Sequence, residues 1–341
     1  MLAEMVEGRL QLWVSQQGGA DRILSFGVKK TSSFESCAEF VANKYKFVLK
    51  PVADDSLFFA EEALHFTGDH YASHGVWYPL TPAGHKEAKL KNETKSRPVA
   101  EYCYKSISNW KVYHFHDTGD TAGMKRLGSV QDNTYLRPDA SNLAAFLYRL
   151  LNESPNVYEE IRKTVRLAIP FFDDFVLKLQ SLKTGEEQIR LLWRQQGSDY
   201  SLWSSQLSDG SLRFICLVTA LLQPTPPSTI IIDEPELGLH PYAITLLGAL
   251  LRSASRRMQV IVSTQSVPLL NEFSLLVFFK HSSLYFVDYL IKLFLPRFIT
   301  VFKRCRPCAR LLESDIKRIC NVCRQAFARL WFVAYQWFTK Q

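Results

Sequence analysis

The sequence predicts an α/β protein in which a parallel sheet follows an antiparallel β meander. Two buried strand patterns, Thr229–Ile232 and Val260–Ser263, alternate with the apolar helix patterns of Ser211–Leu222 and Tyr242–Ser255. Continuous β-branched runs between helices are typical of parallel strands that are covered on both faces. Earlier in the chain, short aromatic runs broken by polar turns between Ser33 and Phe66 predict the strands of the meander.

The remaining segments complete this prediction in chain order. Residues 1–13 are typical of the end of an amphipathic helix, whose apolar face holds Leu2, Met5, Val6, Leu10 and Trp13. Residues 67–98 are polar and predict a surface loop, and Trp110–His116 alternates as a short strand does. We expect helices at Asp139–Asn152, with Ser141 as the cap, and at Tyr158–Ala168, and strands at Phe171–Gln180 and Ile189–Gln195.

Composition divides the chain near residue 273. Of the 41 Lys and Arg and the 33 Asp and Glu, 12 and 3 lie in residues 274–341, which gives that segment a net charge of +9 and leaves −1 for residues 1–273. All 15 Gly also precede residue 274. We therefore expect a core domain at 1–273 and a basic, glycine-free tail at 274–341 that is frameshifted or unrelated to the core. The total charge of +8 marks this boundary and does not indicate an acidic ligand.

Two classes of protein are disfavoured by the distribution of charge. Residues 1–14 hold three charges where a secretory signal needs an apolar core. The longest apolar stretch, residues 284–302, is interrupted by Asp288, Lys292 and Arg297, and one charge near the centre of a spanning helix costs about 2.5–3.5 kcal/mol. We expect a cytoplasmic protein that does not enter a membrane, with reduced thiols at Cys37, Cys103 and Cys216.

The sequence STIIIDEPELGLHP, residues 228–241, carries the clearest chemistry. Its apolar strand delivers Asp233 and Glu234 to the carboxyl end, where open α/β sheets bind ligands. Because adjacent strand residues point in opposite directions, we expect the two acids to have different roles. In a Walker-B-type site, Asp233 would hold Mg²⁺ through water and Glu234 would polarise the attacking water. Alternatively, the acidic pair only caps the following helix.

Two further polar segments flank this strand. In QLSDGSLRF, residues 206–214, Ser208 and Gly210 begin an apolar helix, where backbone N–H groups and the helix dipole favour a phosphate. An ordinary cap with a glycine turn is the alternative. In QVIVSTQS, residues 259–266, a second buried strand ends beside the first and places Gln265 near the acidic pair.

The order of these three motifs resembles the ABC-type ATPase heads of the SMC, RecF and OLD group, and the bacterial predicted ATPases of the AAA family. The resemblance extends over about residues 5–273 through WKVYHFHDTGDT, LRPDASNLAAFLYRL, PFFDDFVLK and GSDYSLWSSQLSDGSLRF. It implies a P-loop NTPase fold with ATP and Mg²⁺ as cofactors. Ser208 and Gly210 then correspond to the signature that contacts the γ-phosphate held by the opposite head, Asp233 and Glu234 to the Walker B acids, and Gln265 to the switch position, which is often His.

The phosphate loop of this family is not found in the 341 residues. No G-x-x-x-x-G-K-[ST] occurs, although phosphoryl transfer needs such a cradle for the β- and γ-phosphates. In the family, this loop opens the helix whose end resembles residues 1–13, so we expect the head to be incomplete at both ends. The chain alone should then bind ATP weakly.

The tail offers a different function. Cys305, Cys308, Cys320 and Cys323 form C-x₂-C-x₁₁-C-x₂-C, a thiolate set able to bind Zn²⁺, and the surrounding Lys and Arg could bind nucleic acid. Against this, the spacer is shorter than the usual 15–20 residues. His114 and His116 share a strand face, but no further metal ligands are evident in the sequence.

Three functions are compatible with these sequence features. The first is ATP binding and hydrolysis by a homodimer or heterodimer of heads, which converts closure into work on DNA or a partner protein. The second is a non-catalytic pseudo-ATPase that acts as an interaction subunit and supplies its signature to a complete head. The third is zinc-dependent nucleic-acid binding through the tail.

Overall fold

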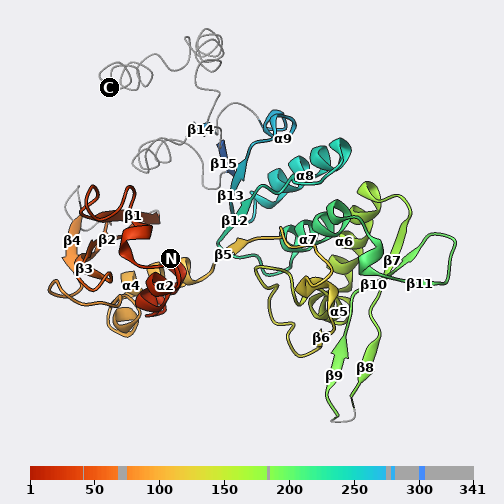
Figure 1. Ribbon diagram of the computed structural model, residues 1–341, viewed down its shortest axis with the longest axis horizontal. Helices are drawn as coiled ribbons and strands as arrows, with labels where there is room; N and C mark the ends of the chain where they lie inside the picture. Colours follow the sequence, from red (N-terminus) through yellow and green to blue (C-terminus); the bar gives the residue numbers. More distant parts are fainter. Residues whose placement is uncertain (41, 68–74, 183–184, 274–277, 281–298, 304–341) are drawn as a thin grey trace, which may run out of the picture.

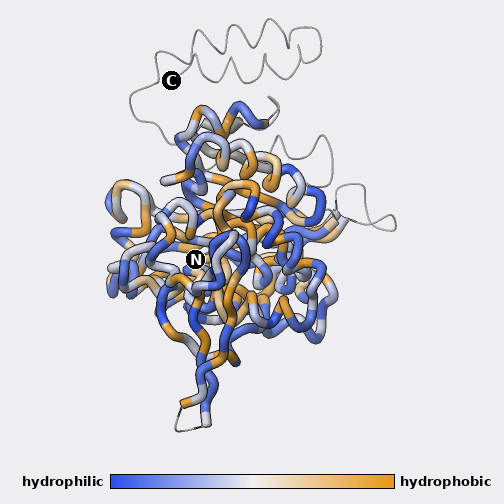
Figure 2. Tube along the Cα trace, turned by 90° about the vertical axis from the view of Figure 1, so that its right-hand side faces the viewer, coloured by the Kyte–Doolittle hydropathy of each residue, from blue (hydrophilic) through white to orange (hydrophobic). Residues whose placement is uncertain are grey.

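The computed structural model describes residues 1–273, apart from 41, 68–74 and 183–184, together with the backbone of 278–280 and 299–303. The described part has two apolar cores. The smaller core lies between the meander and the helices near the N-terminus, and the larger one lies between the parallel sheet and the helices that follow it. Figure 1 shows these as two lobes, and Figure 2 shows apolar residues concentrated toward the middle of the molecule.

The first lobe contains the predicted meander. Strands β1 (Phe34–Phe40), β2 (Asn43–Pro51), β3 (Leu57–Phe66) and β4 (Val76–Pro79) pair antiparallel in chain order. Helices α1 (Leu2–Val6), α2 (Leu10–Gln16), α3 (Ala20–Ile23) and α4 (Pro98–Ser108), with the short helix η1 (Asn92–Lys95), complete the lobe. The aromatic alternation that predicted this sheet is realised in the buried side chains of Tyr45, Phe47 and Phe59.

Two predictions for this lobe were wrong in detail. The single helix expected at residues 1–13 is two helices, because the chain turns at Gly8, which has φ +74°. Its predicted apolar face is nevertheless inward, since Met5, Val6 and Leu10 are fully buried. Residues 67–98 are not simply a surface loop, because they contain β4 and bury Leu80 and Leu90 against the first core. The sequence prediction rested on the average polarity of residues 67–98, and this average does not reveal a few buried apolar residues such as Leu80 and Leu90.

A parallel sheet organises the second lobe. Strands β5 (Trp110–Tyr113), β12 (Thr229–Asp233) and β13 (Gln259–Thr264) pair parallel, and β15 (Ile299–Lys303) and β14 (Phe278–Lys280) extend the sheet beyond β13. The predicted parallel strands are therefore confirmed. The predicted division at residue 273 stays a prediction, although two strands of this sheet lie beyond it.

The helices that share an apolar core with this sheet lie to one side of it and pack on one another (Figure 1). They are α5 (Leu143–Glu153), α6 (Pro155–Ala168), α7 (Asp209–Leu222) and α8 (Pro241–Ala254), and the short α9 (Val267–Asn271) follows β13. Proline at the first turn of α6, α8 and α9 suits positions whose N–H groups have no partner within the helix. On the sheet, Ile230, Ile232, Val260 and Val262 are the buried partners of these helices.

Smaller elements connect these helices and strands. Helix α5 begins after Asn142, not at the predicted cap Ser141, because the Asn142 side chain is drawn inward by three hydrogen bonds to the backbone of residues 132–137. Each of the two strands predicted between 171 and 195 is interrupted, which gives β7 (Phe172–Val176), β8 (Leu179–Ser181), β9 (Glu187–Ile189) and β10 (Leu192–Gln195). β10 pairs with β7 and with β11 (Ser201–Trp203), and β9 pairs with β8 and with β6 (Gly128–Ser129). The short helices η2 (Gly123–Lys125) and η3 (Ser204–Gln206) complete the lobe.

Candidate functional site

The site is built where β12 and β13 end. The two strands are parallel with Asp233 opposite Ser263, so their carboxyl ends lie at the same edge of the sheet. The backbone N–H of Glu234 donates to the carbonyl oxygen of Ser263 at 2.7 Å, which continues the pairing one residue beyond β12. The predicted proximity of the acidic pair to residues 263–266 is present in the structure.

Glu234 leaves the strand with an unusual backbone. β12 ends at Asp233, and Glu234 has φ +42°, in a region that side-chain-bearing residues rarely adopt. The alternation expected of adjacent strand residues therefore does not set the direction of the Glu234 side chain. A rare backbone conformation at a strand end is typical of functional sites, where surrounding contacts hold it in place.

A direct contact joins Glu234 to Gln265. The Nε2 of Gln265 donates to Oε1 of Glu234 at 2.5 Å, although the two residues lie 31 positions apart. Gln265 is exposed and Glu234 is half-buried, so the contact lies at the surface of the sheet edge. An amide can orient a carboxylate or contact a phosphate, but it does not take up a proton as imidazole does.

The carboxylate of Asp233 is available to a ligand. Asp233 is half-buried, and its side chain makes no recorded hydrogen bond or ion pair within the described part of the chain. The carbonyl oxygen of Asp233 lies 3.0 Å from Nε2 of His116, which donates a hydrogen bond to it in the tautomer that carries the proton on Nε2. His116 is therefore engaged with the backbone of the strand end. A free carboxylate at this edge suits a hydrated Mg²⁺.

Ser208 and Gly210, the residues predicted to form the signature, lie at the start of α7. Ser208 caps the helix, since its Oγ accepts a hydrogen bond from the N–H of Ser211 at 3.1 Å, and it is exposed. Gly210 is buried against the turn after β12: a Cβ added to it would lie 2.0 Å from the carbonyl oxygen of Gly238. The glycine is therefore required for close approach of two backbones, a reason that the sequence did not reveal.

Arg213 was missed from the sequence and ties the same elements together. It is only 6% exposed, and its guanidinium donates to the carbonyl oxygens of Phe115 at 2.8 Å, His116 at 3.2 Å and Leu237. The Arg213 side chain thus joins α7 to two segments that are distant from it in the chain, residues 115–116 and the turn at Leu237. The only available signal was a lone arginine on an apolar helix, since buried charges are rare unless their donors are satisfied.

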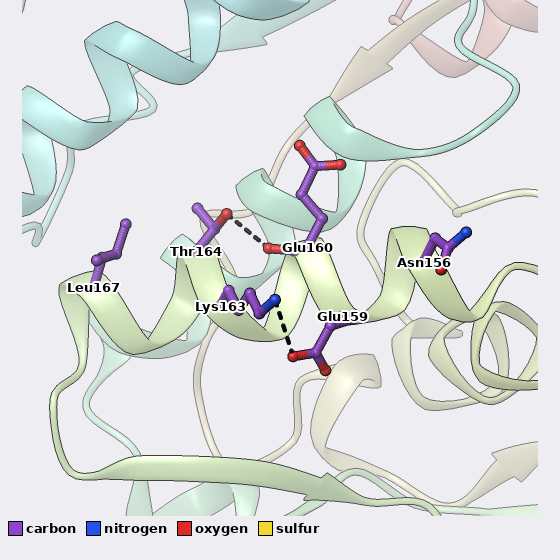
Figure 3. A pocket seen from close by; sticks show the side chains of 6 residues that line it. All are labelled: Asn156, Glu159, Glu160, Lys163, Thr164 and Leu167. Atoms are coloured by element: carbon purple, nitrogen blue, oxygen red, sulfur yellow. Dashed lines mark hydrogen bonds and ion pairs between the residues drawn. The ribbon is translucent and has the colours of Figure 1, made fainter.

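Figure 3 shows a different hollow, along the exposed side of α6, with a volume of about 390 Å³. Some of its polar groups already have partners: the Thr164 hydroxyl donates to the Glu160 carbonyl at 2.7 Å, and Lys163 pairs with Glu159 at 3.6 Å. A second hollow of about 330 Å³ lies near the amino ends of β5 and β12 and includes Asn109, Lys111 and Pro227. Neither hollow includes a predicted site residue.

The predicted zinc site lies outside the described residues, since Cys305, Cys308, Cys320 and Cys323 all fall there. Within the described part of the chain, no group of three or more His, Cys, Asp or Glu is placed to hold a metal. In the same part, Cys37, Cys103 and Cys216 form no disulfide. Burial raises the pKa of the Cys103 thiol to about 12 and also raises the pKa of the Cys216 thiol. No helix of the described residues has the length and apolarity needed to cross a membrane.

Comparison with known proteins finds several solved structures with a related arrangement. An SMC head bound to the C-winged helix domain of ScpA is 10% identical, with a TM-score of 0.43, over 80% of this chain and 78% of that one. A Pyrococcus furiosus Smc head with an extended coiled coil, bound to the C-terminal domain of ScpA, is 11% identical, with a TM-score of 0.37, over 80% and 81%. The Thermotoga maritima SMC head domain is 11% identical, with a TM-score of 0.28, over 68% of each chain.

These low scores carry no argument for function, and a comparison with curated proteins finds no match. The informative comparison is with protein families. Residues 105–271 match the family described as "AAA domain, putative AbiEii toxin, Type IV TA system". The matched segment includes Ser208, Gly210, Asp233, Glu234 and Gln265. Residues 105–271, just under half of the chain, are therefore similar to an AAA domain.

Proposed function

We propose that the strand-end site serves the hydrolysis of Mg²⁺-bound ATP. The observation that carries the proposal is the hydrogen bond between Glu234 and Gln265, which brings a carboxylate and an amide from neighbouring parallel strands to the edge where such sheets bind ligands. The family match supports a nucleotide-binding ATPase function at a coarser level.

The roles of the site residues follow from their chemistry. Asp233, whose carboxylate has no recorded partner among the described residues, would hold Mg²⁺ through water. Glu234 would accept a hydrogen bond from the attacking water and polarise it toward the γ-phosphorus. Gln265 would keep the Glu234 carboxylate in place and sense the γ-phosphate through its amide.

The ATP site would be completed by a second head. The exposed Ser208 and the backbone of Gly210 at the start of α7 suit the γ-phosphate of a nucleotide held by a partner, because N–H groups and the helix dipole favour an anion there. We infer a head-to-head homodimer or heterodimer, whose opening and closing would act on DNA or a partner protein.

A second candidate is favoured by one observation. The 341 residues contain no G-x-x-x-x-G-K-[ST] loop, although Ser208, Gly210, Asp233 and Glu234 resemble a signature and Walker B acids. Such a chain can act as a non-catalytic subunit that presents Ser208 and Gly210 to a head with its own phosphate loop. Co-purification with such a head, together with loss of its ATP turnover when Ser208 is replaced by Arg, would support this function over the first.

ATP turnover tests the main proposal. We expect negligible hydrolysis from the 341-residue chain, and measurable hydrolysis from a version in which a strand, a G-x-x-x-x-G-K-S loop and a helix precede Met1. In that version, Glu234→Gln should lower kcat by about 10²–10⁴-fold, the range for removal of a general base. Glu153→Gln, at an exposed carboxylate on α5, is the control and should leave kcat unchanged. Turnover by the 341-residue chain that Glu234→Gln abolishes would contradict the need for the loop.

A further inference from the structure

A second carboxylate, Glu236, holds the loop that carries Gln265. Its Oε1 accepts hydrogen bonds from the Thr264 hydroxyl at 2.5 Å, from the backbone N–H of Gln265 at 3.3 Å and from that of Ser266 at 3.2 Å. One oxygen thus gathers donors from three consecutive residues. Hydrogen bonds to an ionised acceptor are stronger than those between neutral groups.

Both sides of this contact are fixed by their surroundings. On one side, the turn after β12 is closed by two backbone bonds, from Leu237 to Glu234 at 3.1 Å and from Leu239 to Glu236 at 3.0 Å. On the other side, Thr264 is the last residue of β13 and is fully buried. Glu236 therefore joins the turn after β12 to the end of β13.

Gln265 is bound through both its ends. Its backbone N–H donates to Glu236, and its side-chain amide donates to Glu234. Because Gln265 is exposed and its side chain has several rotatable bonds, the amide stays against Glu234 only at a cost in conformational entropy. Fixing the backbone of Gln265 lowers that entropic cost, because fewer arrangements of its side chain then compete with the contact to Glu234.

The hydrogen bonds of Glu236 are one-sided. Within the described part of the chain, its recorded side-chain bonds go only to residues 264–266, and its other oxygen, Oε2, is buried without a partner. These one-sided bonds are consistent with a residue that holds the loop of residues 264–266.

We propose that Glu236 is a positioning residue for the strand-end site, which fixes the backbone of Gln265 so that its side-chain amide meets Glu234. The meaning of this contact for catalysis rests on the proposed function. The positioning itself needs no nucleotide, so it can be tested independently of ATP hydrolysis.

Two measurements on the 341-residue chain test the proposal. The first is hydrogen exchange at the amides of Gln265 and Ser266. Glu236→Ala should accelerate exchange at Gln265 by about tenfold, because this amide loses its bond to a charged acceptor. The effect at Ser266 should be smaller, because that amide also donates to the Thr264 hydroxyl at 3.0 Å. Glu236→Gln keeps an acceptor oxygen and should accelerate exchange at Gln265 by about threefold. The amide of Glu234, which is bonded to Ser263, should be unchanged, as should all three amides in the control Glu153→Ala.

The second measurement distinguishes positioning from a general structural role. In protein labelled with ¹⁵N at glutamine, the side-chain amide resonance of Gln265 should shift when Glu234 is replaced by Gln. That response should persist in Glu236→Gln and be lost in Glu236→Ala. A Gln265 amide that responds to Glu234→Gln equally in Glu236→Ala and in the unmodified chain would overturn the proposal. If Glu236→Ala does not fold, Glu236→Gln decides, and unchanged exchange at Gln265 and Ser266 overturns it.

Discussion

Two glutamates each hold a loop by accepting hydrogen bonds from its backbone N–H groups: Glu62 in the meander lobe and Glu236 at the ends of β12 and β13. The side chain of Glu62 is fully buried, and both of its oxygens accept hydrogen bonds, from the Tyr45 hydroxyl, from Nε2 of His85 and from the N–H groups of Lys89 and Leu90, at 2.8–3.2 Å. Glu236 uses one oxygen for its loop and leaves the other without a partner among the described residues. Burial and the Glu62 carboxylate raise the pKa of Tyr45 well above its usual value.

The difference separates a structural anchor from a site that is open to ligands. Every acceptor of Glu62 is used, so nothing remains for a ligand, and the network holds residues 80–90 against the first core. At the strand ends, the half-buried Asp233 carboxylate makes no hydrogen bond or ion pair within the described chain. Polar groups left without partners near a sheet edge are the ones that a ligand can use.

The largest loss of stability is expected from substitution of Glu62 in the meander lobe. Glu62→Ala leaves buried donors of Tyr45, Lys89 and Leu90 without an acceptor and should lower the free energy of unfolding by about 3–5 kcal/mol. Urea denaturation followed by circular dichroism measures this loss. Glu61→Ala is the matched control: Glu61 is the exposed neighbour on β3, paired with Lys46, and its loss should cost at most about 1 kcal/mol. Equal losses in the two variants would remove the distinction between anchor and surface carboxylate.

An intermediate effect is expected at the strand-end site. Gly210→Ala places a Cβ against the carbonyl of Gly238 and should lower the free energy of unfolding by about 1–3 kcal/mol, because α7 must move away from the turn after β12. Gly128→Ala is the control, since no atom lies within 4 Å of its added Cβ. If both substitutions are neutral in the same denaturation measurement, the backbones at Gly210 and Gly238 are not closely packed.

The smallest effect concerns acid sensitivity of the meander lobe. Hydrogen bonds from Lys91 and Tyr104 lower the pKa of Glu7 from its usual 4.5, so the folded protein binds this proton less readily than the unfolded chain. The stabilisation by Glu7 is therefore present above about pH 4.5 and is lost as the pH falls below it. Glu7→Gln should lower the melting temperature slightly at pH 7, and by progressively less as the pH falls below 4.5. A difference that persists unchanged in acid would contradict an electrostatic origin.

The sequence predicted the elements whose pattern is local. β-branched runs and aromatic alternation identified the parallel strands and the meander, because burial on a strand repeats with a period of two or is continuous. The approach of Gln265 to Glu234 was also predictable, since parallel strands end at the same edge. In each case the prediction required knowledge of one or two elements only.

Contacts between distant segments were not predictable in this way. Arg213 bonds to the carbonyl of Phe115, 98 positions away, and Gly210 contacts Gly238 through backbone atoms that have no residue-specific pattern. Glu236 lies within the motif that drew attention to Asp233, yet its role depends on the position of residues 264–266. These contacts depend on how the elements pack against one another, which the periodicity of a single element does not predict.

The central claim is that Glu234 promotes hydrolysis of an ATP that is enclosed with the signature of a second head. The most direct measurement is the mass in solution of the Glu234→Gln variant that carries a strand, a G-x-x-x-x-G-K-S loop and a helix ahead of Met1. With Mg²⁺ and ATP, it should form a stable dimer that retains unhydrolysed ATP, and without ATP it should be a monomer. A variant that binds ATP and remains a monomer, or that hydrolyses ATP at the unmodified rate, would contradict the account.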